Sequence, residues 1–246
     1  MKRRALQLFA AAALLALPAA AQSADDVIAK VLQAQGGLDR LKAVQTQRVT
    51  GHLSFGPDAA GLFSLELKRP GKMHMEMTLQ GMTLVRIYDG QKGWQVNPFA
   101  GKAEPEEMSA DDLRNIAAEA DFDGPFVDYK QKGNKVELAG KEKVGGRDAY
   151  RLKVTFPNGD VQSFFFDANT YLKVEWQGTR KINGKDTVFE SFFSDFREVG
   201  GLKMPYVIES ENADNPQKQT MTLDKVEINV KEDDSRFAPP AKAKVN

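Results

Sequence analysis

The feature that most constrains the fold is a long succession of short segments in which apolar and polar residues alternate. Alternation with a period of two is the pattern of a β-strand with one dry and one wet face. The connections carry residues of tight turns, as at Gly56-Pro57, Asp89-Gly90 and Asn158-Gly159. We therefore expect antiparallel strands over residues 46–55, 61–69, 72–80, 83–88, 93–97, 135–139, 149–156, 161–167, 171–178, 186–196, 203–211 and 217–230.

Two helices and a short helical turn are expected beside the strands. Ser23 precedes two acidic residues and then apolar residues at helical spacing, which predicts a capped helix that ends at Gly36-Gly37. A helical turn over residues 38–44 follows it. The second helix begins after Ser109 and runs to about residue 120. The tail from Phe237, which is rich in Pro and Lys, is expected to be loose.

Large side chains occupy the dry positions of the strands, among them Phe63, Phe164, Phe166 and Trp176. A single sheet of about ten or more strands with such a face must curl and cover it. Only two helices and a few loops are available as a cover. We expect a mainly β fold with few helices, in which a strongly curved antiparallel sheet and a small helical lid enclose an apolar cavity. A well-filled core without a cavity is the alternative.

Residues 73–80 show the alternation most clearly, because every odd position is apolar and every even one is polar or ionisable. The dry positions are Met73, Met75, Met77 and Leu79. Methionine is unbranched and polarisable, so it suits a surface that accommodates a variable apolar partner. This strand is therefore interpreted as part of a binding surface, and an ordinary core strand is the alternative.

The first 21 residues have the order of a secretory signal peptide: a basic start, an apolar stretch from Ala5 to Leu17, and small residues before Gln22. The apolar stretch is too short for a comfortable membrane span. Cleavage would leave one domain over residues 22–246. Loss of the three basic residues takes the formal net charge from 0 to −3, so we expect no nucleic-acid partner.

Residues for catalysis or metal binding do not form a recognisable pattern. The two histidines, His52 and His74, fall on the wet side of their strands and are expected to be solvated. The chain lacks the H-E-x-x-H, G-x-S-x-G and G-x-G-x-x-G motifs, and it contains no cysteine. We expect no enzymatic activity, no catalytic residue, no cofactor and no metal site.

Two runs of residues resemble a known family in their order and spacing. The first run is LKRP at residues 67–70, and the second is YDGQKGWQVNPF at residues 88–99, with the strand that contains His74 between them. In this order they look like the periplasmic lipoprotein carriers of the LolA/LolB superfamily. The resemblance implies an incomplete β-barrel, closed by helices, that holds lipoprotein acyl chains. The receptor branch of that superfamily is anchored through a lipidated cysteine, so the chain is more similar to the free-moving carrier.

The resemblance also implies roles for residues and partners. Arg69 stands where the family has a lid-locking arginine that hydrogen-bonds to backbone carbonyls of the lid. The expected cargo is an acylated lipoprotein or lipid, passed from an inner-membrane donor to an outer-membrane acceptor by a monomeric periplasmic carrier. A binder of free lipid or another apolar small molecule, and a structural or partner-binding envelope protein, are the alternatives. The expected cavity residues are Phe63, Leu65, Leu67, Met73, Met75, Met77, Leu79, Trp94, Phe164, Phe166 and Trp176.

Overall fold

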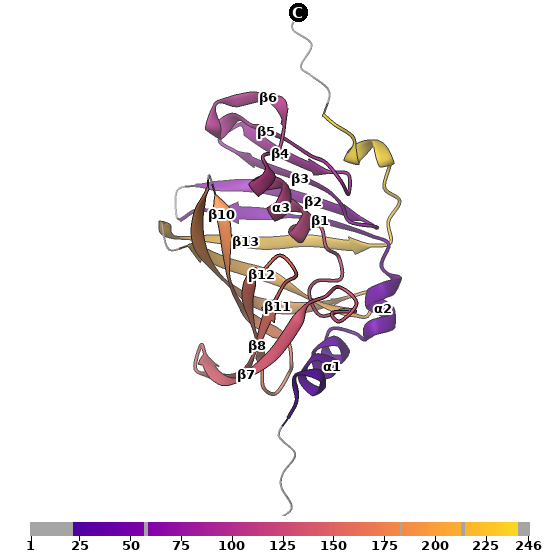
Figure 1. Ribbon diagram of the computed structural model, residues 1–246. Helices are drawn as coiled ribbons and strands as arrows, with labels where there is room; N and C mark the ends of the chain where they lie inside the picture. The colour runs from indigo at the N-terminus through magenta and orange to yellow at the C-terminus, as the bar shows by residue number, and fades with distance from the viewer. Residues whose placement is uncertain (1–21, 57–58, 183, 213–214, 241–246) are drawn as a thin grey trace, which may run out of the picture.

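The computed structural model describes residues 22–56, 59–182, 184–212 and 215–240, and a single antiparallel sheet of thirteen strands dominates them (Figure 1). The predicted signal peptide, residues 1–21, lies outside the described residues. The first series of strands is β1 (Thr46–Ser54), β2 (Ala60–Lys68), β3 (Lys72–Leu79), β4 (Met82–Tyr88), β5 (Gly93–Asn97) and β6 (Lys102–Glu107). A short 3-10 helix, η1 (Pro98–Ala100), connects β5 to β6.

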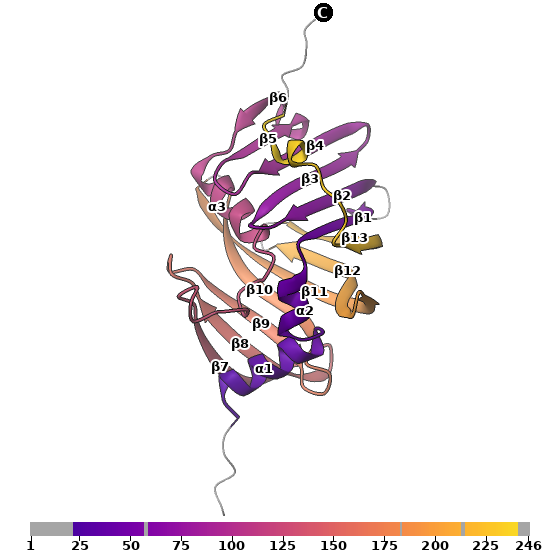
Figure 2. The same ribbon diagram turned by 90° about the vertical axis from the view of Figure 1, so that its right-hand side faces the viewer.

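The second series of strands follows a helix, α3 (Ala110–Glu119), and a long loop. It comprises β7 (Lys135–Val144), β8 (Arg147–Thr155), β9 (Val161–Asp167), β10 (Lys173–Ile182), β11 (Lys185–Val199), β12 (Leu202–Asn212) and β13 (Asn215–Ile228). Because β13 pairs with β1, the sheet order is β6-β5-β4-β3-β2-β1-β13-β12-β11-β10-β9-β8-β7. The edges β6 and β7 do not pair with each other, so the predicted incomplete barrel is confirmed, and Figure 2 shows how the sheet curves.

The register of β2 and β3 assigns the two faces of this half of the sheet. Leu65 lies opposite Met75, and Phe63 lies opposite Met77, on the concave face. Glu66 lies opposite His74, one residue along, and therefore on the convex face. The alternation seen in the sequence thus becomes a difference between an apolar inner face and a polar outer face.

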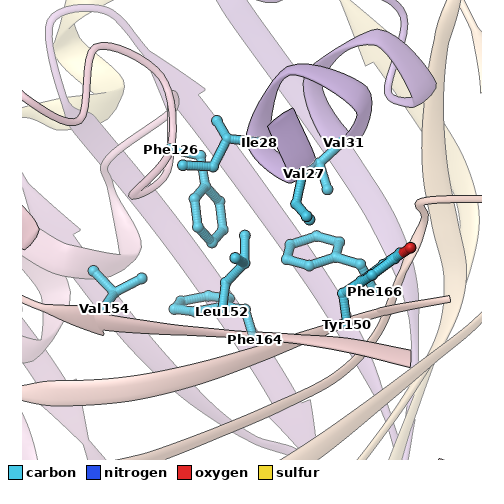
Figure 3. Close-up of a cluster of buried hydrophobic side chains, with 9 residues drawn as sticks. All are labelled: Val27, Ile28, Val31, Phe126, Tyr150, Leu152, Val154, Phe164 and Phe166. Atoms are coloured by element: carbon cyan, nitrogen blue, oxygen red, sulfur yellow. The ribbon is translucent and has the colours of Figure 1, made fainter. Parts of the chain in front are cut away.

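The first helix, α1 (Ala24–Ala34), fills one end of the concave face. Its N-cap is Ser23, whose side chain accepts a 3.1 Å hydrogen bond from the backbone N–H of Asp26, as the sequence predicts. Figure 3 shows the apolar side of α1 packed with Phe126 over residues of β8 and β9. The buried residues of this cluster are Val27, Ile28, Val31, Phe126, Tyr150, Leu152, Val154, Phe164 and Phe166.

A close backbone approach fixes the junction between α1 and α2 (Leu38–Ala43). Gly36 has a φ of +125°, and a Cβ at this position would lie 2.3 Å from the carbonyl oxygen of Gly201. Only glycine permits this contact. The backbone N–H of Lys203 also donates to the carbonyl of Gln35 at 3.0 Å, so the turn between β11 and β12 supports the helix end.

The helix α3 lies over the concave face between the β3 side of the sheet and β10 (Figure 1). Its N-cap is Ser109, as predicted. Ile116 and Ala120, both fully buried, pack against Leu67 and Met73. The side-chain amide of Asn115 donates a 3.1 Å hydrogen bond to the carbonyl of Lys181 in β10. The helix therefore connects two parts of the sheet that are distant in strand order.

The C-terminal segment covers the convex face of β3 and corrects two expectations. It contains the 3-10 helix η2 (Asp234–Phe237), and the carbonyl of Arg236 lies 2.7 Å from Nδ1 of His74. The expectation of a solvated His74 is wrong, because this segment leaves it only 6% exposed. The expectation that the loose tail begins at Phe237 is also wrong, because that residue is buried. His52 is exposed as expected and pairs with Asp224.

None of the helices in the described segments is long and apolar enough to cross a bilayer.

Candidate functional site

A cavity of about 640 Å³ lies on the concave face of the sheet, beside the region that α1 fills. This volume is in the range of pockets that hold small-molecule ligands. The strands from β4 through β1 and β13 to β10, together with α3, contribute to it. Its lining residues are Gln47, Val49, Leu53, Phe63, Leu65, Met73, Met75, Met77, Arg86, Glu119, Trp176, Arg180, Phe189, Ser191, Phe193, Met204, Pro205, Ile208, Ser210, Gln219, Met221, Leu223 and Val226.

Methionine is the most characteristic residue of this lining. Five of the eight methionines of the chain contribute to it: Met73, Met75, Met77, Met204 and Met221. They come from β3 on one side and from β12 and β13 on the other. Because the thioether chain can adopt several rotamers at little cost, such a lining can adapt to the shape of a flexible apolar ligand.

The structure places six of the expected cavity residues in this lining: Phe63, Leu65, Met73, Met75, Met77 and Trp176. Leu67 instead packs beneath α3 with Ile116. Phe164 and Phe166 face the same side of the sheet but belong to the core under α1. Leu67, Phe164 and Phe166 therefore lie on the concave face of the sheet, but a helix covers each of them in place of the cavity.

Two further expected residues lie elsewhere. Leu79 is the last residue of β3 and pairs with Met82 at the hairpin end, beyond the lining. Trp94 pairs with Ile87, which in turn pairs with His74, so the strand register puts Trp94 on the convex face. Trp94, the aromatic residue of the YDGQKGWQVNPF run, thus lies on the opposite face of the sheet from Met75 and outside the cavity lining.

Arg69, which directly follows β2, contacts two separate segments, the end of α2 and the loop after α3. Its Nε donates to the carbonyl of Val44 at 2.6 Å, and its Nη2 donates to the carbonyl of Leu41 at 3.3 Å. Nη1 and Nη2 also donate to the two carboxylate oxygens of Asp123, at 2.7 and 2.6 Å. These bonds hold the pKa of the Asp123 carboxyl below its ordinary value. Arg69 therefore joins the end of α2 to the loop that follows α3.

A cluster of charged residues forms part of the rim of the cavity. Glu119, the last residue of α3, accepts a 2.9 Å hydrogen bond from Arg86 of β4 and a 2.8 Å hydrogen bond from Arg180 of β10. The guanidinium of Arg180 also lies 5.4 Å from the ring centroids of Trp176 and Phe189. The helix is thus attached to both sides of the cavity by one carboxylate.

Other polar groups lie inside the concave face. Ser191 and Ser210 are hydrogen-bonded to each other across β11 and β12, at 2.8 Å. Lys173 lies opposite Phe166 in the ladder, and its Nζ lies 3.8 Å from the ring centroid of Phe193. Burial lowers the pKa of Lys173 to about 8, because removal from water disfavours the charged ammonium group.

The chain matches no family model, and a search of curated proteins returns no match. Several solved structures are similar over most of both chains. A DUF1329 family protein from Desulfovibrio piger has a TM-score of 0.57 and 13% identity, covering 87% of this chain and 96% of its own. A LolA superfamily protein from Nitrosomonas europaea has a TM-score of 0.56 and 13% identity, covering 88% and 97%. The chain therefore has a LolA-like fold.

A third structure with this LolA-like fold is assigned as an outer membrane lipoprotein-sorting protein domain, from Vibrio parahaemolyticus. It has a TM-score of 0.56 and 10% identity, covering 86% of this chain and 94% of its own. At these identities the likeness establishes the fold alone.

Within the LolA-like fold, the sequence analysis missed Arg86, Glu119, Asp123 and Arg180. Arg86 carried a usable signal, because the hairpin register sets it opposite Met75 and therefore on the dry face. A charged residue on an apolar face needs a partner. The identity of that partner, Glu119 of α3, has no local signal in the sequence.

Proposed function

We propose that the protein is an exported periplasmic carrier that shields the acyl chains of a lipoprotein in this cavity and moves them towards the outer membrane, without covalent chemistry. The observation that carries the proposal is the methionine-rich cavity of about 640 Å³ beside α3. Burial of each methylene group is worth about 0.8 kcal/mol, so acyl chains would bind there without specific polar contacts. The lipoprotein-sorting assignment of the Vibrio structure supports the same class of cargo.

A carrier must also release its cargo, and this requires a cover that can open. The contacts of Arg69 with Val44, Leu41 and Asp123 hold α2 and the loop after α3 together. In the proposed function these contacts lock the closed state. An inner-membrane donor and an outer-membrane acceptor would each favour the open state at loading and at delivery.

The proposal is tested by filling the cavity. Met75→Trp and Met77→Trp enlarge two lining residues, and the new rings should occupy volume that acyl chains need. Leu62→Trp is the matched control, because Leu62 lies on the neighbouring strand β2 and is 60% exposed. Calorimetric titration with an acylated peptide should give affinities reduced about tenfold in the two methionine variants and unchanged in the control. Absence of binding by the parent protein would contradict the proposal.

A carrier of free lipid is the second candidate function. The charged rim formed by Arg86 and Arg180 favours it, because charged side chains at the rim suit an amphiphile with its own head group. Native mass spectrometry of protein purified from its own periplasm separates the two functions. The mass of an acylated protein would support the lipoprotein carrier, and the mass of a free lipid would support the alternative. A protein that binds neither would leave a structural or partner-binding role.

A further inference from the structure

Glu119 holds two arginines that come from distant strands. Arg86 lies on β4 and Arg180 on β10, and six strands separate β4 from β10 in the sheet order. One oxygen of the carboxylate accepts from each guanidinium, Oε2 from Arg86 and Oε1 from Arg180. A single anion therefore bridges the two sides of the cavity.

The charges in this cluster do not balance. Among the described residues, Glu119 is the one carboxylate within ion-pair distance of either guanidinium, so two cations share one anion. The side chains of Arg86 and Glu119 are only 17% and 23% exposed. In such a half-buried place charges interact more strongly than in bulk water, and a second negative charge would be stabilised.

Each arginine has a fixed place in the fold besides its bond to Glu119, Arg86 through its backbone and Arg180 also through its guanidinium. Arg86 is set by the β3–β4 ladder, where it lies opposite Met75. Arg180 packs its guanidinium over the rings of Trp176 and Phe189. Both residues would therefore stay beside the apolar cavity if α3 moved away with Glu119, and the Arg180 guanidinium would keep its aromatic contacts.

We propose that Arg86 and Arg180 bind the anionic head group of an amphiphilic cargo, in the place that Glu119 occupies in the closed state. The inference rests on the free-lipid form of the proposed function, because the acyl part of the cargo would fill the apolar cavity and the cargo would carry its own head group. A carboxylate or a phosphate presents two oxygens that can accept from the two guanidiniums, as Glu119 does. The head group and Glu119 compete for the same donors, so binding of the cargo releases one attachment of α3.

The test compares ligands that differ only in charge at the head. Palmitate and hexadecanol supply the same chain with and without an anion, and phosphatidylglycerol and phosphatidylcholine extend the comparison to phosphate head groups. Parent protein should bind palmitate about tenfold more tightly than hexadecanol in calorimetric titration. Arg86→Gln and Arg180→Gln should each reduce this preference to near one. Glu119→Gln should increase it, because it removes the competing anion.

The matched control is Arg151→Gln. Arg151 also pairs with a glutamate, Glu142, and also lies over an aromatic ring, that of Phe165, but it belongs to β8 outside the cavity. It should keep the preference of the parent. Thermal unfolding of each variant shows whether it is folded, and Arg180→Gln, at the more exposed position, keeps the test available if Arg86→Gln fails to fold.

The outcomes distinguish the inference from the function on which it rests. Equal affinity of the parent for palmitate and hexadecanol, or a preference that persists in both arginine variants, would overturn the head-group site while leaving an acyl carrier intact. Binding of inorganic phosphate alone, with no gain from the chain, would show a free-anion site instead. If palmitate, hexadecanol and an acylated peptide all fail to bind, the proposed function fails as well.

Discussion

Arg69 and Asp123 form an ion pair with two parallel hydrogen bonds, Nη1 to Oδ2 at 2.7 Å and Nη2 to Oδ1 at 2.6 Å. This geometry uses the planar fork of the guanidinium fully, which a lysine could not do. The same side chain donates to the carbonyls of Val44 and Leu41. One residue at the end of β2 therefore holds both α2 and the loop after α3.

Arg69→Leu should open the cavity without unfolding the protein. Hydrogen bonds from a charged donor contribute about 1.5–3 kcal/mol, enough to shift a closed cover about tenfold or more towards the open state. We expect stronger binding of a hydrophobic dye by the ligand-free variant, impaired transfer of acylated cargo and an unchanged far-UV circular dichroism spectrum. Arg197→Leu is the control, because it removes a two-bond pair with Asp195 on the exposed surface. Parental dye binding and transfer by Arg69→Leu would rule out the lock.

Asp123→Asn should reduce stability in a pH-dependent manner. Hydrogen bonds from Arg69 hold the pKa of Asp123 below its ordinary value, so the folded state favours the carboxylate. The stability gained from this pair is fully present above about pH 4–5 and is lost as the pH falls through the lowered pKa. Urea unfolding should therefore show the parent more stable than the variant by about 1–3 kcal/mol at pH 7, with the difference shrinking towards pH 2. A difference that stays constant with pH would contradict this assignment.

The strands could be predicted from the sequence because their signals are local. Alternation over residues 73–79 and turn residues at Asp89-Gly90 act within a few positions, and the structure has β3 and a hairpin there. β6 was missed because Pro105 and its glutamates are unfavourable in a strand interior. As the edge strand of the sheet, β6 tolerates both, and its charges discourage pairing with another chain.

The cover of the sheet could not be predicted in the same way. Phe166 and Met75 both lie on the dry face of a strand, yet α1 packs on the first and a cavity adjoins the second. Alternation tells which face a residue occupies and not what lies above it. The pairs of Arg69 with Asp123 and of Arg180 with Glu119 join residues 54 and 61 positions apart, and no local pattern encodes them.

The filled and hollow parts of the concave face should respond differently to the same truncation. Leu152 is fully buried under α1, whereas Leu65 is half-buried and lines the cavity. Leu152→Ala should cost about 3–5 kcal/mol of unfolding free energy, and Leu65→Ala about 1–2 kcal/mol, because a side chain beside a cavity already lacks contacts on one side. Urea unfolding of the two variants measures both values. Equal large losses would mean that the chain packs both regions as a core.

Lys173→Met should stabilise the protein at neutral pH, and the gain should vanish in alkali. Burial lowers the pKa of Lys173 to about 8, so below pH 8 the folded state holds an ammonium group that is poorly solvated. Between about pH 8 and 10.5 the folded state releases this proton before the unfolded state does, and the cost disappears. The contact with Phe193 offsets part of this desolvation cost, which leaves an expected gain in unfolding free energy of about 1–3 kcal/mol at pH 7.

Lys141→Met is the control, since Lys141 also lies over an aromatic ring, that of Tyr150, but is exposed. Urea unfolding at pH 7 and pH 10.5 measures the gain, and destabilisation by Lys173→Met at pH 7 would show instead that the ammonium group supports the fold.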